Sequence, residues 1–432
     1  MRRMFELLLI SIVIVLLSAC MARPSAPPVA IPDSPMWLVH DPAGLLRNLP
    51  RMVGSQSPLP APSAHALTVW QIAPTSWISV EMDLVALEYV SPPRAARCYA
   101  LLAAGINDAV LLAEMARARG LDVSDDAAMA GAAERIMSYS HPLRADLVRQ
   151  RAADARWVGV WRGQATAAGV AAGQLIGQAV AERVIAWAQR DRAEQFTAFS
   201  DPMLAPGVWQ RTPPHLWSAL EPGWGQVQPI ALPSAKQMNA VVPPAWDSPA
   251  FVAERAAFLG VQQRLSASDR ALALRWAAPV GSVTPAGLWL QIARDAIEQN
   301  HIAPRQAAAL YATLAVTMHD SFIACWFSKY TYMVARPITW MRASEPAWLS
   351  LIDTPPFPSY PSGHATVSGA ASTVLAHYFP QDAARLHQLA EDAAYSRVVG
   401  GIHWPIDGRN GLAQGRTIGN WILATTATVV AR

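Results

Sequence analysis

The sequence predicts an all-α protein made of two stacked helical bundles. Alanine-rich segments with helical periodicity run from about residue 93 to 192 and again from 249 to the C-terminus, while the alternating pattern of β-strands is nearly absent. The chain has 432 residues, of which 52% are hydrophobic, so it is long enough for two domains of ordinary size. Three pairs of similar segments indicate that the bundles arose by internal duplication.

Each pair joins a segment of the first half to one of the second, and the pairs occur in the same order. Alanine-rich segments match easily by chance, but three ordered matches with slowly drifting offsets favour a duplication. The pairs are residues 99–108 with 311–320, 131–142 with 369–380, and 169–178 with 411–420, at offsets of 212, 238 and 242.

Composition divides the chain into five predicted segments. Ten prolines between residues 23 and 64, without periodicity, favour a stiff tether. Proline pairs between 200 and 248 exclude long helices and predict a connector rich in Pro and Trp. The segments are a lipoprotein-type signal peptide (1–20), the tether (21–77), a first bundle without site motifs (78–199), the connector (200–248) and a second bundle that carries the active site (249–432).

The N-terminus has the pattern of an exported lipoprotein. Arg2 and Arg3 precede an apolar run, Leu7–Leu17, that is too short to span a bilayer but suits a secretory signal. The Ser-Ala-Cys that follows resembles a bacterial lipobox, in which Cys20 is lipidated. Because residue 21 is methionine rather than aspartate, the periplasmic face of the outer membrane is the expected location. An ordinary signal peptide or an uncleaved anchor is the alternative.

The charge and the cysteine content exclude several functions. With 34 basic and 31 acidic residues, the net charge of +3 leaves no surplus of cations for a nucleic-acid partner. Three cysteines, and the absence of CxxC and HExxH patterns from the sequence, argue against a disulfide framework and against zinc sites of the usual spacing.

Candidate catalytic residues gather in three clusters of the second half. Lys329, one of only two lysines in the chain, is a compact positive charge, and Arg336 and Arg397 each offer a planar fork for two oxygens. Ser362 supplies a hydroxyl, and the amide of Gly363 allows close approach because no Cβ intervenes. Together these groups are what a tetrahedral oxyanion needs. The clusters are Lys329-x6-Arg336-Pro337, Pro361-Ser362-Gly363-His364 and Ser396-Arg397-x5-His403-x3-Asp407.

Two histidines complete the candidate site. An apolar stripe after His364 predicts that the Ser-Gly-His opens a helix, where free N–H groups and the helix dipole favour an anion. Asp407 lies four residues after His403 and is expected to orient its ring. An oriented imidazole at His403 can attack phosphorus or ligate a metal, with His364 as the acid–base partner on the other side of the anion.

These motifs resemble the three signature motifs of the superfamily that joins type-2 phosphatidic acid phosphatases to vanadium-dependent haloperoxidases. The doubled bundle is also similar to a haloperoxidase, whereas simple phosphatases of this superfamily are usually one shorter bundle. The resemblance implies that vanadate is the cofactor, that His403 is the axial vanadium ligand and that His364 assists the deprotonation of peroxide. The residues that would hold the equatorial oxygens are Lys329, Arg336, Ser362, Gly363 and Arg397.

The resemblance implies an exported enzyme that oxidises halide with hydrogen peroxide. The same set of oxyanion-binding residues suits an acid or lipid phosphatase. Such an enzyme would act on a phosphoester through a phosphohistidine at His403 and would need no cofactor. A non-catalytic lipoprotein that only binds oxyanions is the third hypothesis. Trp326 and Phe357 match the wall of the halide pocket in chloride-type haloperoxidases, although Ala335 stands where these often have tryptophan. A lipid anchor implies a membrane partner, and homo-oligomerisation stays open.

Overall fold

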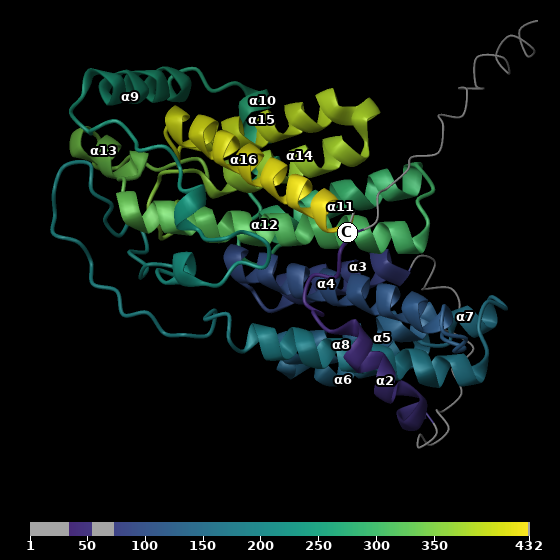
Figure 1. The fold of residues 1–432 in the computed structure, drawn as a ribbon. Coiled ribbons are helices and arrows are strands. Elements are labelled where there is room, and N and C mark those ends of the chain that lie inside the picture. The colour runs from purple at the N-terminus through teal and green to yellow at the C-terminus, as the bar shows by residue number, and fades with distance from the viewer. Residues whose placement is uncertain (1–33, 54–72, 431–432) are drawn as a thin grey trace, which may run out of the picture.

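The structure, a computed structural model, describes residues 34–53 and 73–430, and this part of the chain is all-α, as predicted. The β pairing among these residues is limited to an isolated antiparallel bridge between Val208 and Val334. The helices lie in two layers, one above the other in Figure 1. The predicted signal peptide and Cys20 lie outside the described residues.

Three long helices form the lower layer in Figure 1, and they pack against one another: α4 (Pro92–Arg117), α5 (Asp125–Ser140) and α8 (Ala167–Ala188). Ser124 begins α5 and Thr166 begins α8, because each side chain accepts a hydrogen bond from a backbone amide of the first turn. Shorter helices complete this first bundle: α3 (Ala73–Leu87), α6 (Ala145–Ala155) and α7 (Val158–Trp161).

The upper layer repeats this arrangement with α12 (Pro304–Tyr332), α14 (Gly363–Tyr378) and α16 (Pro405–Val430). Helices α14 and α16 pack closely against each other, as α5 and α8 do in the first bundle. The other helices of this second bundle are α9 (Pro249–Gln262), α10 (Ala267–Arg275), α11 (Thr284–Gln299), α13 (Pro337–Ser344) and α15 (Ala383–Val399).

The two bundles meet where α4 packs against α12. By length and composition each of these helices could span a membrane, but their most apolar windows are 83% and 100% buried inside the protein. Most buried side chains of both bundles form one continuous hydrophobic core, and a second, smaller cluster lies around Phe251, Phe258 and Trp404. Both helices are therefore placed as core helices of the folded protein.

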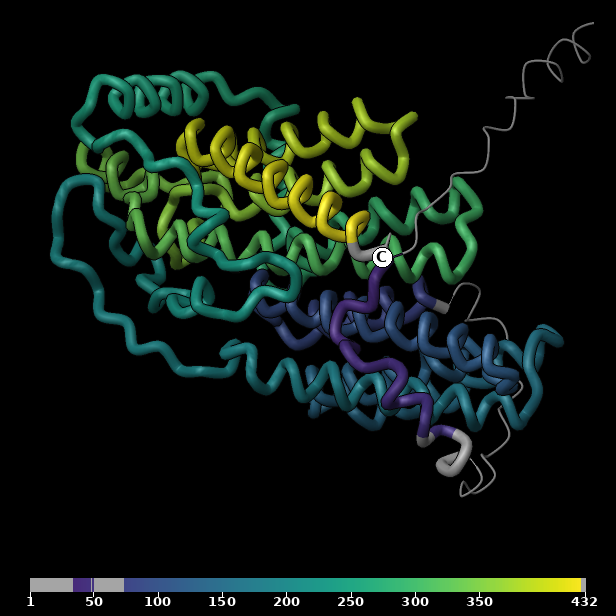
Figure 2. The backbone as a smooth tube through the Cα atoms, viewed as in Figure 1, coloured from purple at the N-terminus to yellow at the C-terminus, as the bar shows by residue number. Residues whose placement is uncertain are grey.

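The segment between α8 and α9 runs along one side of the molecule from the first bundle to the second (Figure 2). It has no long helix, as its prolines predict, and contains only short 3-10 turns at Trp224–Gln226 and Lys236–Met238. Trp209 and Trp224 are buried, and the backbone amide of Trp209 donates to the carbonyl of Met333 at 2.6 Å. The connector therefore packs on the second bundle instead of looping away from it.

Two buried aspartates show the duplication in atomic detail. The Asp108 carboxylate, on α4, accepts hydrogen bonds from the backbone amides of residues 37–39 at 2.8–3.0 Å. The Asp320 carboxylate, on α12, accepts the amides of residues 230–232 at 2.8–2.9 Å. The two aspartates are 212 residues apart, which is the offset of the first sequence alignment. Each one fastens the extended segment that leads into its own bundle.

The third sequence alignment, at an offset of 242, is wrong by one helical turn. Close contacts between glycines of α8 and backbone atoms of α5 recur between α16 and α14 at an offset of 238. The sequence misleads here because glycines occur every four residues in both α8 and α16, so identities also accumulate one turn out of register. The equivalent contacts are Gly173 to Ser124 and Gly177 to Ala128 in the first bundle, and Gly411 to Ser362 and Gly415 to Thr366 in the second.

The tether predicted over residues 21–77 is wrong for the part of it that the structure describes. Trp37, Leu38 and Val39 are buried, and α2 (Pro42–Val53) packs against α8. The density of prolines was misleading because Pro42 stands in the first turn of a helix, where its missing N–H costs nothing. Residues 34–53 therefore belong to the folded body of the protein.

We expect Asp320→Ala to lower the free energy of unfolding by ~3 kcal/mol or more, because three amides lose their acceptor at ~1–3 kcal/mol each. Asp320→Asn keeps one acceptor oxygen and should lose less. If the halves are equivalent, Asp108→Ala should have a similar effect. Urea denaturation followed by circular dichroism measures all three, and wild-type stability of Asp320→Ala would contradict the fastening role.

Candidate active site

Helix α12 carries Lys329 in its last turn and ends at Met333, whose backbone is left-handed with φ 51°. The Lys329 ammonium is fully buried. It donates to the carbonyls of Pro358 and Ser359, both at 2.9 Å, and to that of Pro361 at 2.5 Å. Lys329 therefore binds the carbonyls of the loop that leads into α14 and places a positive charge next to that loop.

Arg336 precedes α13 and is also fully buried. Its Nε donates to the carbonyl of Phe357 at 2.9 Å and its Nη1 to that of Ile402 at 2.7 Å, which fixes the guanidinium plane. Its Nη2 is buried and finds no hydrogen-bond partner among the described residues. A buried donor without an acceptor is costly, so this atom indicates that an acceptor binds here.

Ser362 begins α14, as its sequence predicts, and its Oγ accepts from the amide of Ala365 at 3.4 Å. The backbone amide of Ser362 donates to the carbonyl of Asp407 at 3.0 Å, which joins the start of α14 to the start of α16. At Gly363 a Cβ would lie 3.3 Å from the ring of Trp326. Glycine therefore fits this tight position at the start of α14.

Arg397 reaches the site from the last turn of α15, and His364 from the first turn of α14. Nη1 of Arg397 donates to the carbonyl of Trp276 at 2.6 Å. The Nε of Arg397 and the Nε2 of His364 are both buried without a partner in the described part of the chain. Burial, and next the charge of Arg397, lowers the pKa of His364 well below its ordinary value. A neutral His364 is available to accept a proton.

His403 lies between α15 and α16, and its two ring nitrogens have different partners. Nδ1 is 2.8 Å from Oδ2 of Asp407, and Nε2 is 3.0 Å from Nη1 of Arg336. A guanidinium can only donate, so Nε2 is the acceptor and Nδ1 carries the hydrogen. The Nε2 lone pair of His403 thus faces the cations, where it can meet an electrophilic centre.

Ser359 belongs to the site although the sequence analysis did not identify it. Its Oγ donates to Oδ2 of Asp407 at 2.5 Å and lies 3.4 Å from Nδ1 of His403. It stands three residues before Ser362, but Pro-Ser is ordinary turn sequence and gave no separate signal. Ser359 helps to hold the carboxylate that orients the histidine.

Three buried cations share this part of the described structure with one carboxylate. Burial, together with the charge of Arg336, lowers the pKa of Lys329 to about 7. Burial likewise lowers the pKa of Arg336 and that of Arg397 to about 9, raises that of Asp407 to about 6, and places that of His403 well below its usual range. All these shifts favour the uncharged form of each group, because each is buried away from water. The basic side chains outnumber the single carboxylate, so a bound anion would offset the excess positive charge.

The two residues predicted to line a halide pocket pack against the cations. The rings of Trp326 and Phe357 lie 4.9 Å apart. Nζ of Lys329 is 5.0 Å from the Phe357 ring centre and 5.7 Å from that of Trp326, and the Arg336 guanidinium is 4.9 Å from Phe357. The faces of these two rings therefore stabilise the charged forms of Lys329 and Arg336.

The equivalent place in the first bundle lacks the catalytic side chains. The amide of Ser124 donates to the carbonyl of Gly169 at 2.9 Å, the counterpart of the bond that joins α14 to α16. At this offset of 238, Gly169 occupies the position of Asp407, and Ala165 that of His403. The first bundle keeps the helix arrangement but has neither the histidine nor the aspartate.

We expect Arg336→Lys to fold normally but to lose about tenfold or more in affinity for phosphate or vanadate, because lysine keeps the charge and loses the planar fork. Isothermal titration calorimetry measures this affinity. Arg385→Lys, on the exposed surface of α15, is the matched control. Unchanged anion affinity in Arg336→Lys would remove this residue from the anion's immediate contacts.

Comparison with known proteins bears on these residues directly. The family model of the PAP2 superfamily matches residues 307–430, which include every predicted oxyanion ligand. Vanadium chloroperoxidase of Curvularia inaequalis is 34% identical over 88 residues, and this match covers 17% of the chain and only 14% of that relative.

Solved structures resemble the chain over most of its length. A bacterial vanadium-dependent iodoperoxidase is 25% identical with a TM-score of 0.71, over 82% of this chain and 95% of that one. A bacterial vanadium-dependent chloroperoxidase in its holo form is 14% identical with a TM-score of 0.60, over 88% and 98%, which shows the fold alone. The resemblance drawn from the three motifs is confirmed: residues 307–430 match the model of the PAP2 superfamily, and the chain has a fold like that of the vanadium haloperoxidases.

Proposed function

We propose that the protein is a vanadium-dependent haloperoxidase that oxidises halide with hydrogen peroxide. The observation that carries the proposal is the cradle of three buried cations in which Nη2 of Arg336 and Nε of Arg397 have no acceptor among the described residues. Vanadate fits this donor set, because its oxygens can accept from both guanidinium groups and its charge offsets the cations. The doubled bundle, which resembles a bacterial iodoperoxidase over 95% of that chain, supports this chemistry over that of a single-bundle phosphatase.

Each side chain has a defined task in this proposal. When bound, vanadate supplies a Lewis-acidic centre that activates hydrogen peroxide toward halide. Nε2 of His403 would bind the vanadium, and Asp407 keeps the hydrogen on Nδ1. Neutral His364 accepts a proton from peroxide. The oxygens of vanadate would be held by Lys329, Arg336, Ser362, Gly363 and Arg397.

Reconstitution with orthovanadate tests the proposal. The vanadate-loaded protein and the metal-free protein are compared in two assays, oxidation of iodide by hydrogen peroxide and release of phosphate from a phosphomonoester. Iodide is the halide that is easiest to oxidise, and bromide and chloride then define the selectivity. We expect halide oxidation only with vanadate. Phosphate release by the metal-free protein, without halide oxidation by the loaded one, would reject the proposal.

The phosphatase remains the second candidate for one reason in the structure. The Nε2 lone pair of His403 faces the oxyanion cradle, as a nucleophile for phosphorus would. In that case His403 would carry the phosphoryl group, His364 would protonate the leaving group, and vanadate would inhibit. Inhibition or activation by vanadate therefore separates the two functions in one experiment.

We also propose that the protein is exported and anchored to the outer membrane through Cys20. The support is the N-terminal sequence, in which an apolar run ends in Ser-Ala-Cys. Cell fractionation of wild-type protein and of Cys20→Ser tests this. We expect the wild type in the membrane fraction and an active Cys20→Ser variant in a soluble one, and equal distribution would contradict lipidation.

A further inference from the structure

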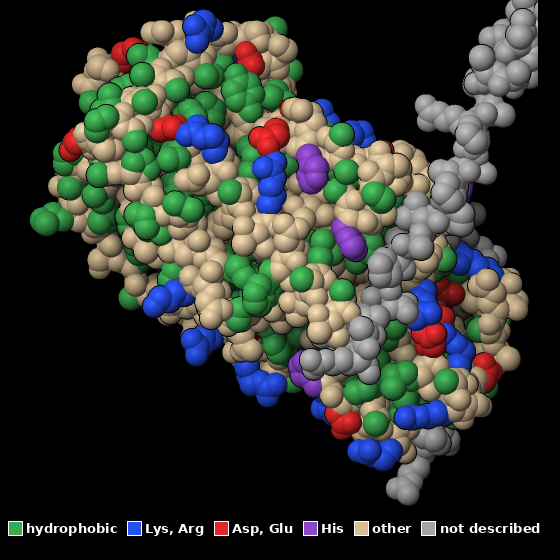
Figure 3. All heavy atoms as spheres, turned by 45° about the horizontal axis from the view of Figure 1, so that its top comes forward, with side chains coloured by type: hydrophobic (Ala, Val, Ile, Leu, Met, Phe, Trp, Pro, Cys, Tyr) green, Lys and Arg blue, Asp and Glu red, His purple; other side chains and the backbone are tan. Residues whose placement is uncertain are grey.

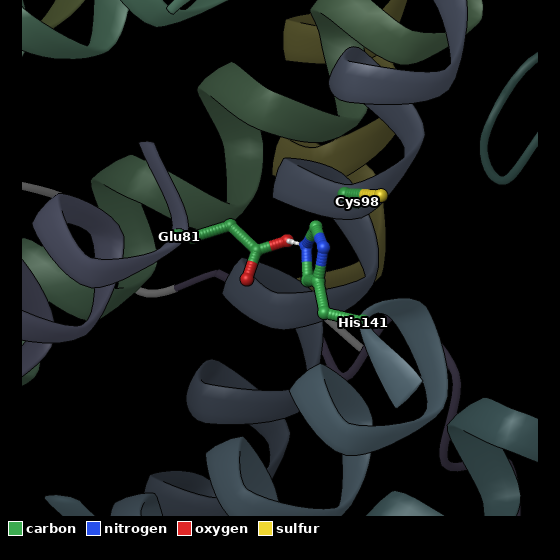
Figure 4. A group of neighbouring side chains, drawn as sticks. All are labelled: Glu81, Cys98 and His141. Atoms are coloured by element: carbon green, nitrogen blue, oxygen red, sulfur yellow. Dashed lines mark hydrogen bonds and ion pairs between the residues drawn. The ribbon is translucent and has the colours of Figure 1, made fainter. Parts of the chain in front are cut away.

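A second cluster of reactive side chains lies in the first bundle, away from the oxyanion site. Glu81 comes from α3, Cys98 from α4, and His141 from the residue that follows α5, and the three side chains converge (Figure 4). A carboxylate oxygen, the thiol sulfur and a ring nitrogen all lie within 4.8 Å of one another. Glu81 and His141 are fully buried and Cys98 is 8% exposed.

Two carboxylates contact the His141 ring in this cluster. Nε2 of His141 is 3.0 Å from Oε1 of Glu81, and Nδ1 is 2.8 Å from Oε2 of Glu88. The second oxygen of Glu81 is buried without a hydrogen-bond partner in the described residues. Such an atom is costly in a protein core unless something binds it.

We propose that Glu81, Cys98 and His141 bind a divalent transition metal of the zinc type. Thiolate, imidazole and carboxylate are the three protein ligands of Zn²⁺. The three candidate ligand atoms lie within 4.8 Å of one another, so small side-chain movements bring them onto one tetrahedral ion. Glu88 then holds the Nδ1 hydrogen of His141, which is the usual arrangement of a carboxylate behind a metal-bound histidine. The oxyanion site is cationic and does not compete for such an ion.

Cys98 gives the site a route to solvent. It lines a cavity of about 560 Å³ together with Tyr89, Ser91 and Tyr139. Arg94 and Arg97 also border this cavity. Arg94 is paired with Glu194 and Glu221, and Arg97 is paired with Asp191 and Glu194. A cation can therefore approach the thiol, and a water molecule from the cavity can complete four-fold coordination.

The alternative is a purely structural ion pair, in which the His141 imidazolium bridges Glu81 and Glu88 and the thiol takes no part. The two cases are separated by titrating Zn²⁺ and Co²⁺ into vanadate-free, untagged full-length protein with the substitution Cys20→Ser, so that Cys98 and Cys325 are the remaining thiols. We expect one tightly bound ion per chain, a thiolate-to-cobalt charge-transfer band, and a melting temperature that rises with Zn²⁺.

Variants assign the ion to these residues. Cys98→Ser changes one atom and should fold, but it should lose the charge-transfer band and at least roughly 100-fold in affinity. Cys325→Ser, the other buried thiol, should keep both. Glu81→Gln should keep the band and bind more weakly. The proposal is overturned if the wild type binds no ion above the level of Cys98→Ser, or if cobalt binds without the thiolate band. Halide oxidation and phosphate release are not readouts here, so this result is independent of the proposed function.

Discussion

His403→Ala is expected to lose tight vanadate binding and to lower vanadate-dependent halide oxidation by roughly 10³-fold or more. The substitution removes the Nε2 lone pair of the histidine. Nε2 accepts from Arg336, and Asp407 keeps the ring hydrogen on Nδ1, so that Nε2 carries none. The remaining cations can attract an anion but cannot form the axial bond. Equilibrium dialysis against vanadate and an iodide oxidation assay measure the two effects.

His364→Ala is the matched control, because it removes a second imidazole from the same site. We expect this variant to keep most of its vanadate affinity and to lose roughly 10²–10⁴ in turnover, the usual share of general acid–base catalysis. Thermal unfolding of both vanadate-free variants shows whether each still folds. If His364→Ala loses vanadate while His403→Ala retains it, the two roles are reversed.

Part of the candidate site's geometry could be predicted, where its contacts are local in sequence. His403 and Asp407 are four residues apart at the start of α16, a spacing that brings the two side chains within 2.8 Å. Ser362 could be recognised as a helix start from the apolar stripe that follows it. The distant members, Lys329 and Arg336, were placed by their resemblance to known motifs and not by any pattern that predicts their contacts.

Contacts between distant segments could not be predicted. Asp108 and Asp320 appeared in the sequence only as matching ends of two aligned segments, and nothing there indicated that each binds three backbone amides. Residues 34–53 were assigned to a tether because proline content reports local stiffness, whereas burial of Trp37 depends on a helix far along the chain. The cluster of Glu81, Cys98 and His141 has no motif, since its members come from three separate elements.

Acidic and basic side chains both lie on the surface of the protein. On the face in Figure 3, acidic and basic side chains are interspersed and no broad patch of one sign is visible. This distribution agrees with the net charge of +3. A concentration of positive charge is instead buried in the second bundle, at Lys329, Arg336 and Arg397, and composition gives no information about it.

A chain that lacks residues 1–199 is expected to be insoluble or unfolded, although it retains every residue of the oxyanion site. The 18-residue apolar window of α12 is 100% buried, and α12 packs against α4 of the deleted bundle. Exposure of that face would create an apolar patch larger than soluble proteins tolerate. Expression yield, size-exclusion chromatography and binding of a hydrophobic dye measure this outcome.

Two shorter deletions, of residues 1–33 and 1–53, serve as controls for the deletion of residues 1–199. Removal of residues 1–33 leaves every described contact in place, and the product should fold and remain active. Removal of residues 1–53 takes away the three amides that Asp108 binds and the packing of α2 on α8, so it should fold with a lower melting temperature. A soluble, fully active fragment that begins near residue 200 would show that the second bundle is self-sufficient. The first bundle would then be dispensable, and the balance would move from a haloperoxidase toward a compact phosphatase of the same superfamily.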